Sequence, residues 1–219
     1  MTAQSESAWE ESPGESATRR RSQLERRTTA EQALLDSASK LFAERGVDQT
    51  SLALVGEQAG YSRGLVNHHF GSKAALVDRL VRRSQKRFVA RMAEFDGTEV
   101  ETFVALLRSY FAAISEGADE TRAYFVMWGA ALPLGAELRP SIAAGDEQLR
   151  SGLAALVVHG QNRQAISSTV DPTSFATLVA GMLRGVAAQY MVDPAGVDLA
   201  GALELFEKFV RDTLTRQSS

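Results

Sequence analysis

The sequence predicts an all-α fold, with an N-terminal helix-turn-helix domain of three helices and a larger C-terminal helical domain. Three observations support this prediction. Apolar residues recur at helical spacing through most of the 219 residues, and no segment shows a convincing strand pattern. Only 5 Pro interrupt the chain. Residues 50–73 form two short helical segments joined by a turn that contains glycine, which is typical of a helix-turn-helix.

The composition excludes several classes of protein. Hydrophobic residues make up 44% of the chain, which is enough for a buried core. No apolar run reaches the roughly 18 residues that suggest a membrane span, and the N-terminus lacks the apolar centre of a signal peptide. Cysteine is absent, so neither a disulfide nor a thiolate metal site is expected. We therefore expect a cytoplasmic protein with no membrane partner.

The formal net charge of −3 is unevenly distributed along the chain. Residues 1–18 contain four Glu and no basic residue. Residues 19–73 contain 9 Lys/Arg and 6 Asp/Glu, whereas residues 74–219 contain 15 and 17. The basic surplus therefore coincides with the helix-turn-helix segment, which supports binding to nucleic acid.

Residues 1–24 are rich in Ser, Glu and Gly and poor in apolar residues, so we expect a disordered tail. The basic run at residues 19–27 is either a solvated linker or an arm that contacts DNA phosphates or the minor groove. The first helix should begin near Thr28, because Thr28 and Glu31 fit a capping box, and should end at Gly46. Its buried stripe is predicted to comprise Leu34, Leu35, Ala38, Leu41 and Phe42.

The helix-turn-helix follows at residues 51–69. Its first helix ends at Gly60, because glycine readily adopts the left-handed conformation found at helix ends. Ser62 is a suitable N-cap for the second helix, which fits the DNA major groove in proteins of this kind. Gly56 lies inside the helix that ends at Gly60, at an interior position where Gly costs about 1 kcal/mol relative to Ala. A close approach between two helices is the expected reason for this glycine.

The run AGYSRGLVNHHFGSKAAL resembles the signature of the tetracycline-repressor (TetR) family of bacterial transcription regulators. The matching features are LFAERG at the end of the first helix, Thr50-Ser51 at the start of the second, and His69, Phe70, Gly71, Ser72, Lys73 and Leu76. The resemblance covers roughly residues 27–80. The remaining chain resembles the family only in its length and its helical pattern. The sequence departs from the family at Asn67 and His68, where aromatic residues are usual.

This resemblance implies a DNA-binding domain at residues 25–73 and a domain for dimerisation and ligand sensing at residues 74–216. It also implies a repressor that acts on a double-stranded DNA operator. We expect Arg63, Asn67 and His68 to reach base edges, with Gly64 allowing close approach. Phosphate contacts are expected from Thr50, Ser51 and Lys73, at the two ends of the motif. The full predicted DNA-binding set is Thr50, Ser51, Ser62, Arg63, Gly64, Asn67, His68 and Lys73.

Local signals define the helices of the larger domain. Ser72 is a candidate N-cap for a long connecting helix, Thr98 and Glu101 form a second capping box, and Asp171-Pro172 combines an N-cap with Pro at the first helical position. After the connecting helix at residues 72–96 and the helix that follows Thr98, the remaining helices are predicted at about residues 121–131, 138–159, 171–191 and 198–216.

Two surfaces of the larger domain are predicted to bind partners. The aromatic excess between Phe103 and Trp128 predicts a cavity for a mostly apolar small molecule, with core packing as the alternative for each residue. Its expected lining is Phe103, Leu107, Phe111, Tyr124, Met127 and Trp128.

The last two helices are expected to form a four-helix bundle with a second copy, unless both pack within the monomer. The expected homodimer interface is Phe175, Val179, Met182, Val186, Leu203, Phe206 and Val210.

These features predict a dimeric regulator that binds a palindromic operator and is released from it by a small, mostly apolar effector. One alternative is a DNA-binding regulator with no effector, controlled by protein partners or abundance. Another is a helical interaction protein whose motif no longer binds DNA. The three histidines form no ligand cluster and no catalytic motif is present, so no enzyme activity, metal or cofactor is expected.

Overall fold

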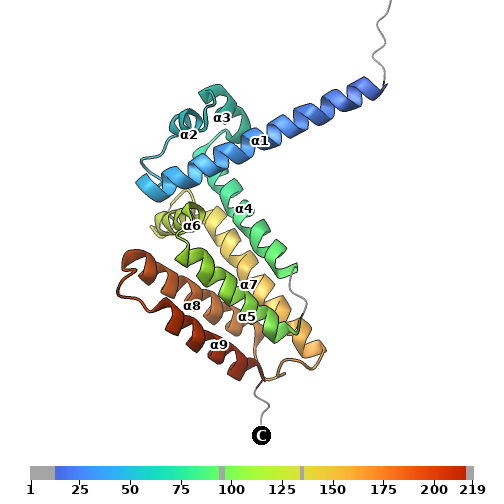
Figure 1. Cartoon of the computed structure of the whole chain (residues 1–219), viewed down its shortest axis with the longest axis vertical. Coiled ribbons are helices and arrows are strands. Elements are labelled where there is room, and N and C mark those ends of the chain that lie inside the picture. The colour runs from blue at the N-terminus through green and yellow to red at the C-terminus, as the bar shows by residue number, and fades with distance from the viewer. Residues whose placement is uncertain (1–12, 94–96, 134–135, 216–219) are drawn as a thin grey trace, which may run out of the picture.

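The computed structural model describes residues 13–93, 97–133 and 136–215. Within these ranges the backbone forms nine helices and no strand, which confirms the predicted all-α class. Figure 1 shows α1–α3 at one end of the molecule, connected by α4 to a stack of longer helices. The helices are α1 (Pro13–Arg45), α2 (Leu52–Ala59), α3 (Arg63–Phe70), α4 (Lys73–Ala93), α5 (Glu99–Ser115), α6 (Asp119–Ala130), α7 (Arg139–Asn162), α8 (Pro172–Val192) and α9 (Leu199–Thr215).

Helix α1 begins at Pro13 rather than near Thr28, so the expected disordered tail is wrong for residues 13–24. Residues 15–27 contain no Gly or Pro, and a nucleated helix extends at little cost through residues of ordinary helix propensity. Thr28 therefore lies within the helix and does not cap it. Figure 1 shows the first turns of α1 projecting beyond α2 and α3. Residues 1–12, the rest of the expected tail, lie outside the described residues.

One hydrophobic cluster joins the helix-turn-helix to the larger domain. The predicted stripe of α1 is buried, with Leu34, Leu41 and Phe42 at 0% exposure. These side chains pack with residues of α2, α3 and α4. Ala123 and Met127 of α6 belong to the same cluster. The domain formed by α1–α3 therefore shares its hydrophobic core with α6 of the larger domain.

A second hydrophobic cluster holds α5 against α7, α8 and α9. The ring of Phe103 meets Phe175 edge-on, with their centroids 5.4 Å apart. Two charged pairs bridge α5 and α9 at the surface: Arg108 donates to Glu207 at 2.7 and 2.8 Å, and Arg211 donates to Glu101 at 2.5 and 3.0 Å. The predicted capping box at Thr98 is thus half formed, because the Glu101 carboxylate faces Arg211 while the Thr98 hydroxyl accepts from the Glu101 N–H.

The close approach predicted at Gly56 is confirmed. A Cβ at Gly56 would lie 2.7 Å from Val66 Cγ2 and 3.0 Å from the Tyr61 carbonyl oxygen. The two helices of the motif therefore cross at a point where only glycine fits. Because the Tyr61 contact is a backbone atom, it cannot move aside without shifting the turn between α2 and α3.

We predict that Gly56→Ala lowers the free energy of unfolding by about 1–2 kcal/mol. Overpacking costs roughly 1–3 kcal/mol, and the better helix propensity of Ala returns at most about 1 kcal/mol. Urea unfolding measures the change. Gly129→Ala in α6 is the matched control, because a Cβ there meets nothing within 4 Å, and it should not destabilise the protein. Equal stability of the two variants would contradict the proposed crossing.

Candidate functional site

Both helices of the helix-turn-helix are capped, and the sequence predicts the stop at Gly60 and the N-cap at Ser62. The Ser51 hydroxyl accepts a hydrogen bond from the Leu54 N–H at 3.2 Å, and Gly60 ends α2 in the left-handed conformation with φ 76°. The Ser62 hydroxyl accepts from the Leu65 N–H at 3.3 Å, which starts α3. These bonds define a tight turn and fix the angle at which α3 leaves α2.

The outer face of α3 brings together most of the predicted DNA-binding residues. Arg63, Asn67 and His68 are all exposed, as are Ser62 and Gly64. A Cβ at Gly64 would meet only the Ser62 hydroxyl, at 3.8 Å, so packing within the protein does not require glycine there. The space above Gly64 is therefore open on this face of α3.

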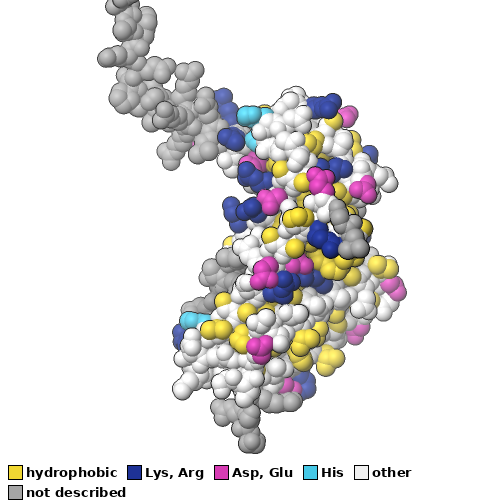
Figure 2. All heavy atoms as spheres, turned by 180° about the vertical axis from the view of Figure 1, so that it is seen from behind, with side chains coloured by type: hydrophobic (Ala, Val, Ile, Leu, Met, Phe, Trp, Pro, Cys, Tyr) yellow, Lys and Arg dark blue, Asp and Glu magenta, His cyan; other side chains and the backbone are white. Residues whose placement is uncertain are grey.

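A groove lies between α3 and residues 25–30 of α1. It is lined by Arg26, Arg27 and Thr29 of α1 and by His68 and His69 of α3, among others. Figure 2 shows histidine and basic side chains gathered at this end of the molecule. Burial lowers the pKa of His69, and the nearby Arg27 and Arg79 lower it further against the opposing effect of Glu31. The groove places Arg26 and Arg27 of α1 next to α3.

Two predicted phosphate contacts have internal roles instead. Thr50 is only 1% exposed, and its hydroxyl donates to the Gly46 carbonyl at 2.8 Å. The Lys73 ammonium donates to the carbonyl of Val47 at 2.8 Å and lies 3.4 Å from that of Asp48. Both side chains therefore tie down the connection between α1 and α2. Ser51, which is exposed at the start of α2, keeps its predicted place on the surface.

The larger domain contains a cavity of about 270 Å³. Its walls come from α4, α5, α6, α7 and α8, and apolar or aromatic groups predominate. The polar lining side chains include Gln85 of α4, Tyr110 of α5, Tyr124 of α6 and Arg184 of α8, and the apolar ones include Phe125, Leu149 and Leu183. An apolar cavity with a few polar groups is the usual form of a small-molecule site.

Only Tyr124 of the six predicted ligand-binding residues lines this cavity. Phe103, Leu107 and Phe111 are 1–2% exposed and pack in the core against other helices. Met127 is also buried, and the Trp128 indole N–H donates to Asp146 at 3.1 Å. The prediction failed because the largest apolar side chains of α5 form its core-facing stripe. The cavity is lined instead by Tyr110, which neighbours Phe111, and by Phe125 of α6.

Sequence reasoning missed Arg184, which lies at the cavity wall. The sequence does contain a signal for it, because Arg184 is the one charged residue in the otherwise apolar and polar α8. Its guanidinium donates to Asp146 of α7 at 2.5 Å, and both side chains are about 15% exposed or less. Burial raises the pKa of Tyr124 to about 12, so its hydroxyl stays protonated and donates to Asp146 at 2.9 Å.

The last two helices expose an apolar surface. Helix α8 is long and apolar enough to cross a membrane by length and composition, yet only 33% of its apolar window is buried in the protein. Leu178 of α8 is 58% exposed and Leu205 of α9 is 70% exposed. Gly181 and Gly185, also exposed on α8, have open space above them. Figure 2 shows hydrophobic side chains along this edge of the larger domain.

This surface differs from the predicted dimer interface. Four predicted interface residues are at most 5% exposed and pack inside the protomer's own core: Phe175, Val179, Phe206 and Val210. Met182, Val186 and Leu203 are half-buried. The apolar stripe that the sequence pattern identifies on each helix is the face that packs inward. The outward face of α8 and α9 carries residues outside that stripe, including Gly181, Gly185, Leu178 and Leu205.

Two family models match the chain. The model for bacterial regulatory proteins of the tetR family matches residues 34–80, and the model for the C-terminal domain of BetI-type transcriptional repressors matches residues 99–215. The repressor BepR from Brucella suis is 27% identical over 188 residues, which cover 80% of this chain and 88% of BepR. The repressor KstR2 from Rhodococcus jostii is 45% identical, but the match spans only 22% of this chain and 24% of KstR2.

Solved structures with the same fold include a TetR-family regulator from Rhodococcus sp., with a TM-score of 0.78 at 19% identity, covering 86% of this chain and 100% of that one. The SmeT–triclosan complex has a TM-score of 0.75 at 22% identity, and the match covers 87% of this chain and 93% of SmeT. A regulator from Saccharomonospora viridis in complex with choline has a TM-score of 0.71 at 19% identity, and the match covers 87% of this chain and 100% of that one.

We predict that Lys73→Met lowers the free energy of unfolding by about 1–2 kcal/mol, because a charged donor to two backbone carbonyls is lost. Urea unfolding again measures the change. Lys40→Met is the control, since Lys40 is exposed on α1, and it should unfold like the parent. If Lys73→Met is as stable as the parent, the proposed anchoring role is wrong and the original prediction of a phosphate contact is restored.

Proposed function

The chain belongs to the tetR family of bacterial regulatory proteins, and from this premise we propose that it is a dimeric repressor released from its operator by a small molecule. The observation that carries the proposal is the combination of an exposed recognition helix and a mainly apolar cavity, joined by α4. The family consists of transcriptional regulators rather than enzymes. A regulator of this kind acts where the DNA is, so we retain a cytoplasmic location.

The exposed face of α3 supports sequence-specific DNA binding. Arg63 stands in the first turn of the recognition helix, the part that meets base edges in helix-turn-helix proteins. Arginine can donate two hydrogen bonds to guanine in the major groove. Asn67 and His68 lie one turn further along the same face and can donate to bases or phosphates. The N-terminus of α2, with Ser51, supplies free backbone N–H groups that suit a phosphate.

The cavity supports a small-molecule effector over control by protein partners alone. Related folds have been solved in complex with triclosan and with choline. Helix α4 connects the two functions, because its first residue, Lys73, holds the α1–α2 connection while Ser84, Gln85 and Arg87 line the cavity. An effector that fits better when α4 is displaced would separate or rotate the recognition helices.

The effector can shift this equilibrium only through a difference in affinity for the two arrangements. A nearly complete switch needs a difference of about 5.5 kcal/mol. Operator DNA must weaken effector binding by the same factor, because the coupling is reciprocal. An effector that binds the free protein and the operator complex equally well would leave a DNA-binding protein without the proposed switch.

The exposed surface of α8 and α9 supports a two-fold dimer. Gly181 and Gly185 allow a second helix to approach closely, and Leu178 and Leu205 offer apolar area for burial. Pairing these helices with those of a second copy would make a four-helix bundle. The dimer would place two recognition helices on one side, which suits a palindromic operator whose half-sites are one helical turn, or a multiple of it, apart.

We predict that Arg63→Ala weakens binding to the operator by about 1–3 kcal/mol and relaxes base preference at one position. The operator is first obtained by selecting bound fragments from random DNA, and affinities are then measured at physiological salt. Lys208→Ala, an exposed residue of α9, is the control and should bind like the parent. Equal affinity of the parent protein for the selected operator and for scrambled DNA would refute the proposed function.

We predict that the double variant Leu178→Asp/Leu205→Asp is monomeric at micromolar concentration, because four buried carboxylates in one dimer would be strongly unfavourable. Sedimentation equilibrium measures the mass. Val158→Asp is the control, since Val158 is 44% exposed on a different helix, α7, and it should remain dimeric. A monomeric parent protein, or a double variant that still dimerises, would exclude this interface.

A further inference from the structure

Tyr110, Tyr124 and Arg184 line the cavity, and Asp146 holds Tyr124 and Arg184 by hydrogen bonds. The exposed area of the lining is mainly apolar, and Phe125, Leu149 and Leu183 contribute to it. Other polar side chains also reach the cavity: Ser84, Gln85, Arg87, Glu116, Glu120, Thr121 and Gln148. A ligand would therefore lie largely against apolar side chains and could meet the group formed by Tyr110, Tyr124 and Arg184. The kind of ligand atom that this group accepts can be worked out from the bonds already made there.

The Asp146 carboxylate is fully engaged by the protein. Its Oδ1 accepts from the Tyr124 hydroxyl at 2.9 Å and from the Arg184 guanidinium at 2.5 Å. Its Oδ2 accepts from the Trp128 indole N–H at 3.1 Å. Three donors from α6 and α8 thus converge on one carboxylate of α7. Asp146 therefore serves to hold Arg184 and Tyr124 in place and is not itself a cavity-lining group.

Donor groups remain available on the cavity side. The Arg184 guanidinium carries five N–H donors, which is more than its hydrogen bonds to Asp146 and to the Tyr124 hydroxyl use. The Tyr110 hydroxyl has no hydrogen-bond partner within the described residues. Burial raises the pKa of Tyr110, so the hydroxyl remains a donor at every ordinary pH. Because Tyr110 lines the cavity, a ligand or a water molecule there can accept a hydrogen bond from this hydroxyl.

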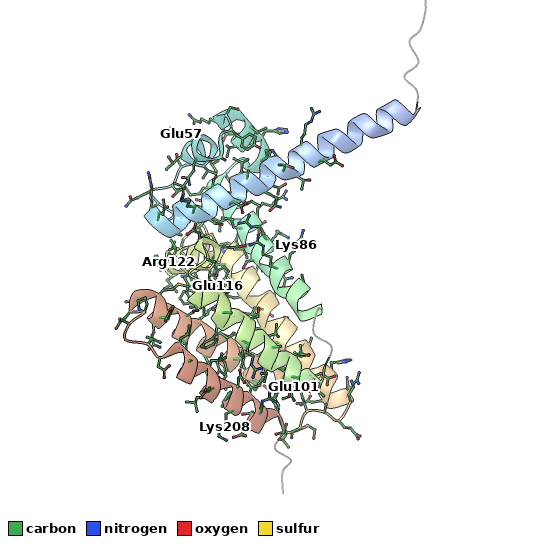
Figure 3. The ribbon with its side chains drawn as sticks, viewed as in Figure 1. Glu57, Lys86, Glu101, Glu116, Arg122 and Lys208 are labelled. Carbon is green, nitrogen blue, oxygen red and sulfur yellow. The ribbon has the colours of Figure 1, made fainter. Side chains whose placement is uncertain are left out.

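The charges around the cavity disfavour an anion. Arg184 is paired with Asp146, and Arg87 is paired with Glu120 of α6. Figure 3 marks Glu116, Lys86 and Arg122 on the surrounding helices, and of these three only Glu116 lines the cavity. Within the described residues, each cationic side chain of the lining therefore already has a carboxylate partner. An incoming carboxylate would meet no uncompensated positive charge and one additional negative charge.

We propose that the cavity binds an uncharged, largely apolar molecule whose carbonyl-type oxygen accepts hydrogen bonds from Tyr110 and Arg184. This inference rests on the proposed function insofar as it treats the cavity as the effector site. The size of the cavity narrows the ligand further, because an engineered cavity of about 150 Å³ takes benzene and this one measures about 270 Å³. A body of two fused rings, or an aliphatic group of similar bulk, fits that volume.

The test uses three probes with the same bicyclic body and heads of nearly equal shape: 2-acetylnaphthalene, 2-isopropylnaphthalene and 2-naphthoate. Each is titrated calorimetrically into the full-length protein without DNA. The ketone should bind about threefold to tenfold more tightly than the hydrocarbon, which is the usual net gain from a hydrogen bond. The carboxylate should bind more weakly than both. Tightest binding by the carboxylate, equal binding of ketone and hydrocarbon, or no binding by any probe at millimolar concentration would overturn the proposal.

The variant Tyr110→Phe separates a ligand contact from a structural role. It removes a hydroxyl that has no partner among the described residues and keeps the ring, so thermal stability should be unchanged or slightly higher. The affinity of the ketone should fall about threefold to tenfold, and that of the hydrocarbon should stay the same. Tyr190→Phe in α8, outside the cavity lining, is the matched control. An equal loss of affinity for ketone and hydrocarbon would contradict the proposed contact.

A separate measurement distinguishes failure of this inference from failure of the proposed function. The ketone is titrated into the protein bound to its selected operator, and release of the DNA is followed by anisotropy. Ketone binding with the expected preference but without release supports the ligand class and refutes the effector role. Release of DNA by the carboxylate in preference to the ketone supports the effector role and refutes the ligand class.

Discussion

The arrangement of the two domains depends on one buried guanidinium, that of Arg83 in α4. The residue is 9% exposed and donates to Asp36 at 2.6 Å, to the Ser39 hydroxyl at 3.0 Å and to the Leu35 carbonyl at 3.4 Å, all on α1. On its other side it faces Glu120 of α6 at 3.4 Å. Removing a charge from water costs several kcal/mol unless partners surround it. Displacing α1 or α6 from α4 would therefore strip partners from a buried charge.

The Glu120 carboxylate belongs both to this junction and to the cavity. It lies at the cavity wall, pairs there with Arg87, and has its other oxygen next to the Arg83 Nε. That oxygen and Nε are buried without a well-aligned hydrogen bond among the described residues. The position of α6 therefore affects how well Arg83 is compensated. A ligand that presses on α6 acts on a charge that also holds α1, which gives the cavity a physical route to the recognition helix.

The predictable parts of the structure are those specified by neighbouring residues. The cap at Ser62, the stop at Gly60 and the close approach at Gly56 all depend on residues nearby in the sequence, and each was predicted. The internal role of Lys73 depends on a loop 25 and 26 residues away, which no local pattern reveals. The cavity lining failed for a related reason. Periodicity identifies the face of a helix that packs most tightly, whereas a cavity forms beside that face, at Tyr110 and Arg184.

Helix α8 combines the two proposed binding surfaces. Leu183 and Arg184 face the cavity, while Leu178, Gly181 and Gly185 lie on the exposed side. This explains why the helix is apolar in composition yet only one-third buried in its most apolar stretch. Arg184 is held by Asp146 of α7, so a ligand that contacts its guanidinium acts on both helices. In the proposed dimer, a small rotation of α8 would change the angle between the protomers. Occupancy of the cavity can then alter the spacing of the recognition helices through the dimer interface as well as through α4.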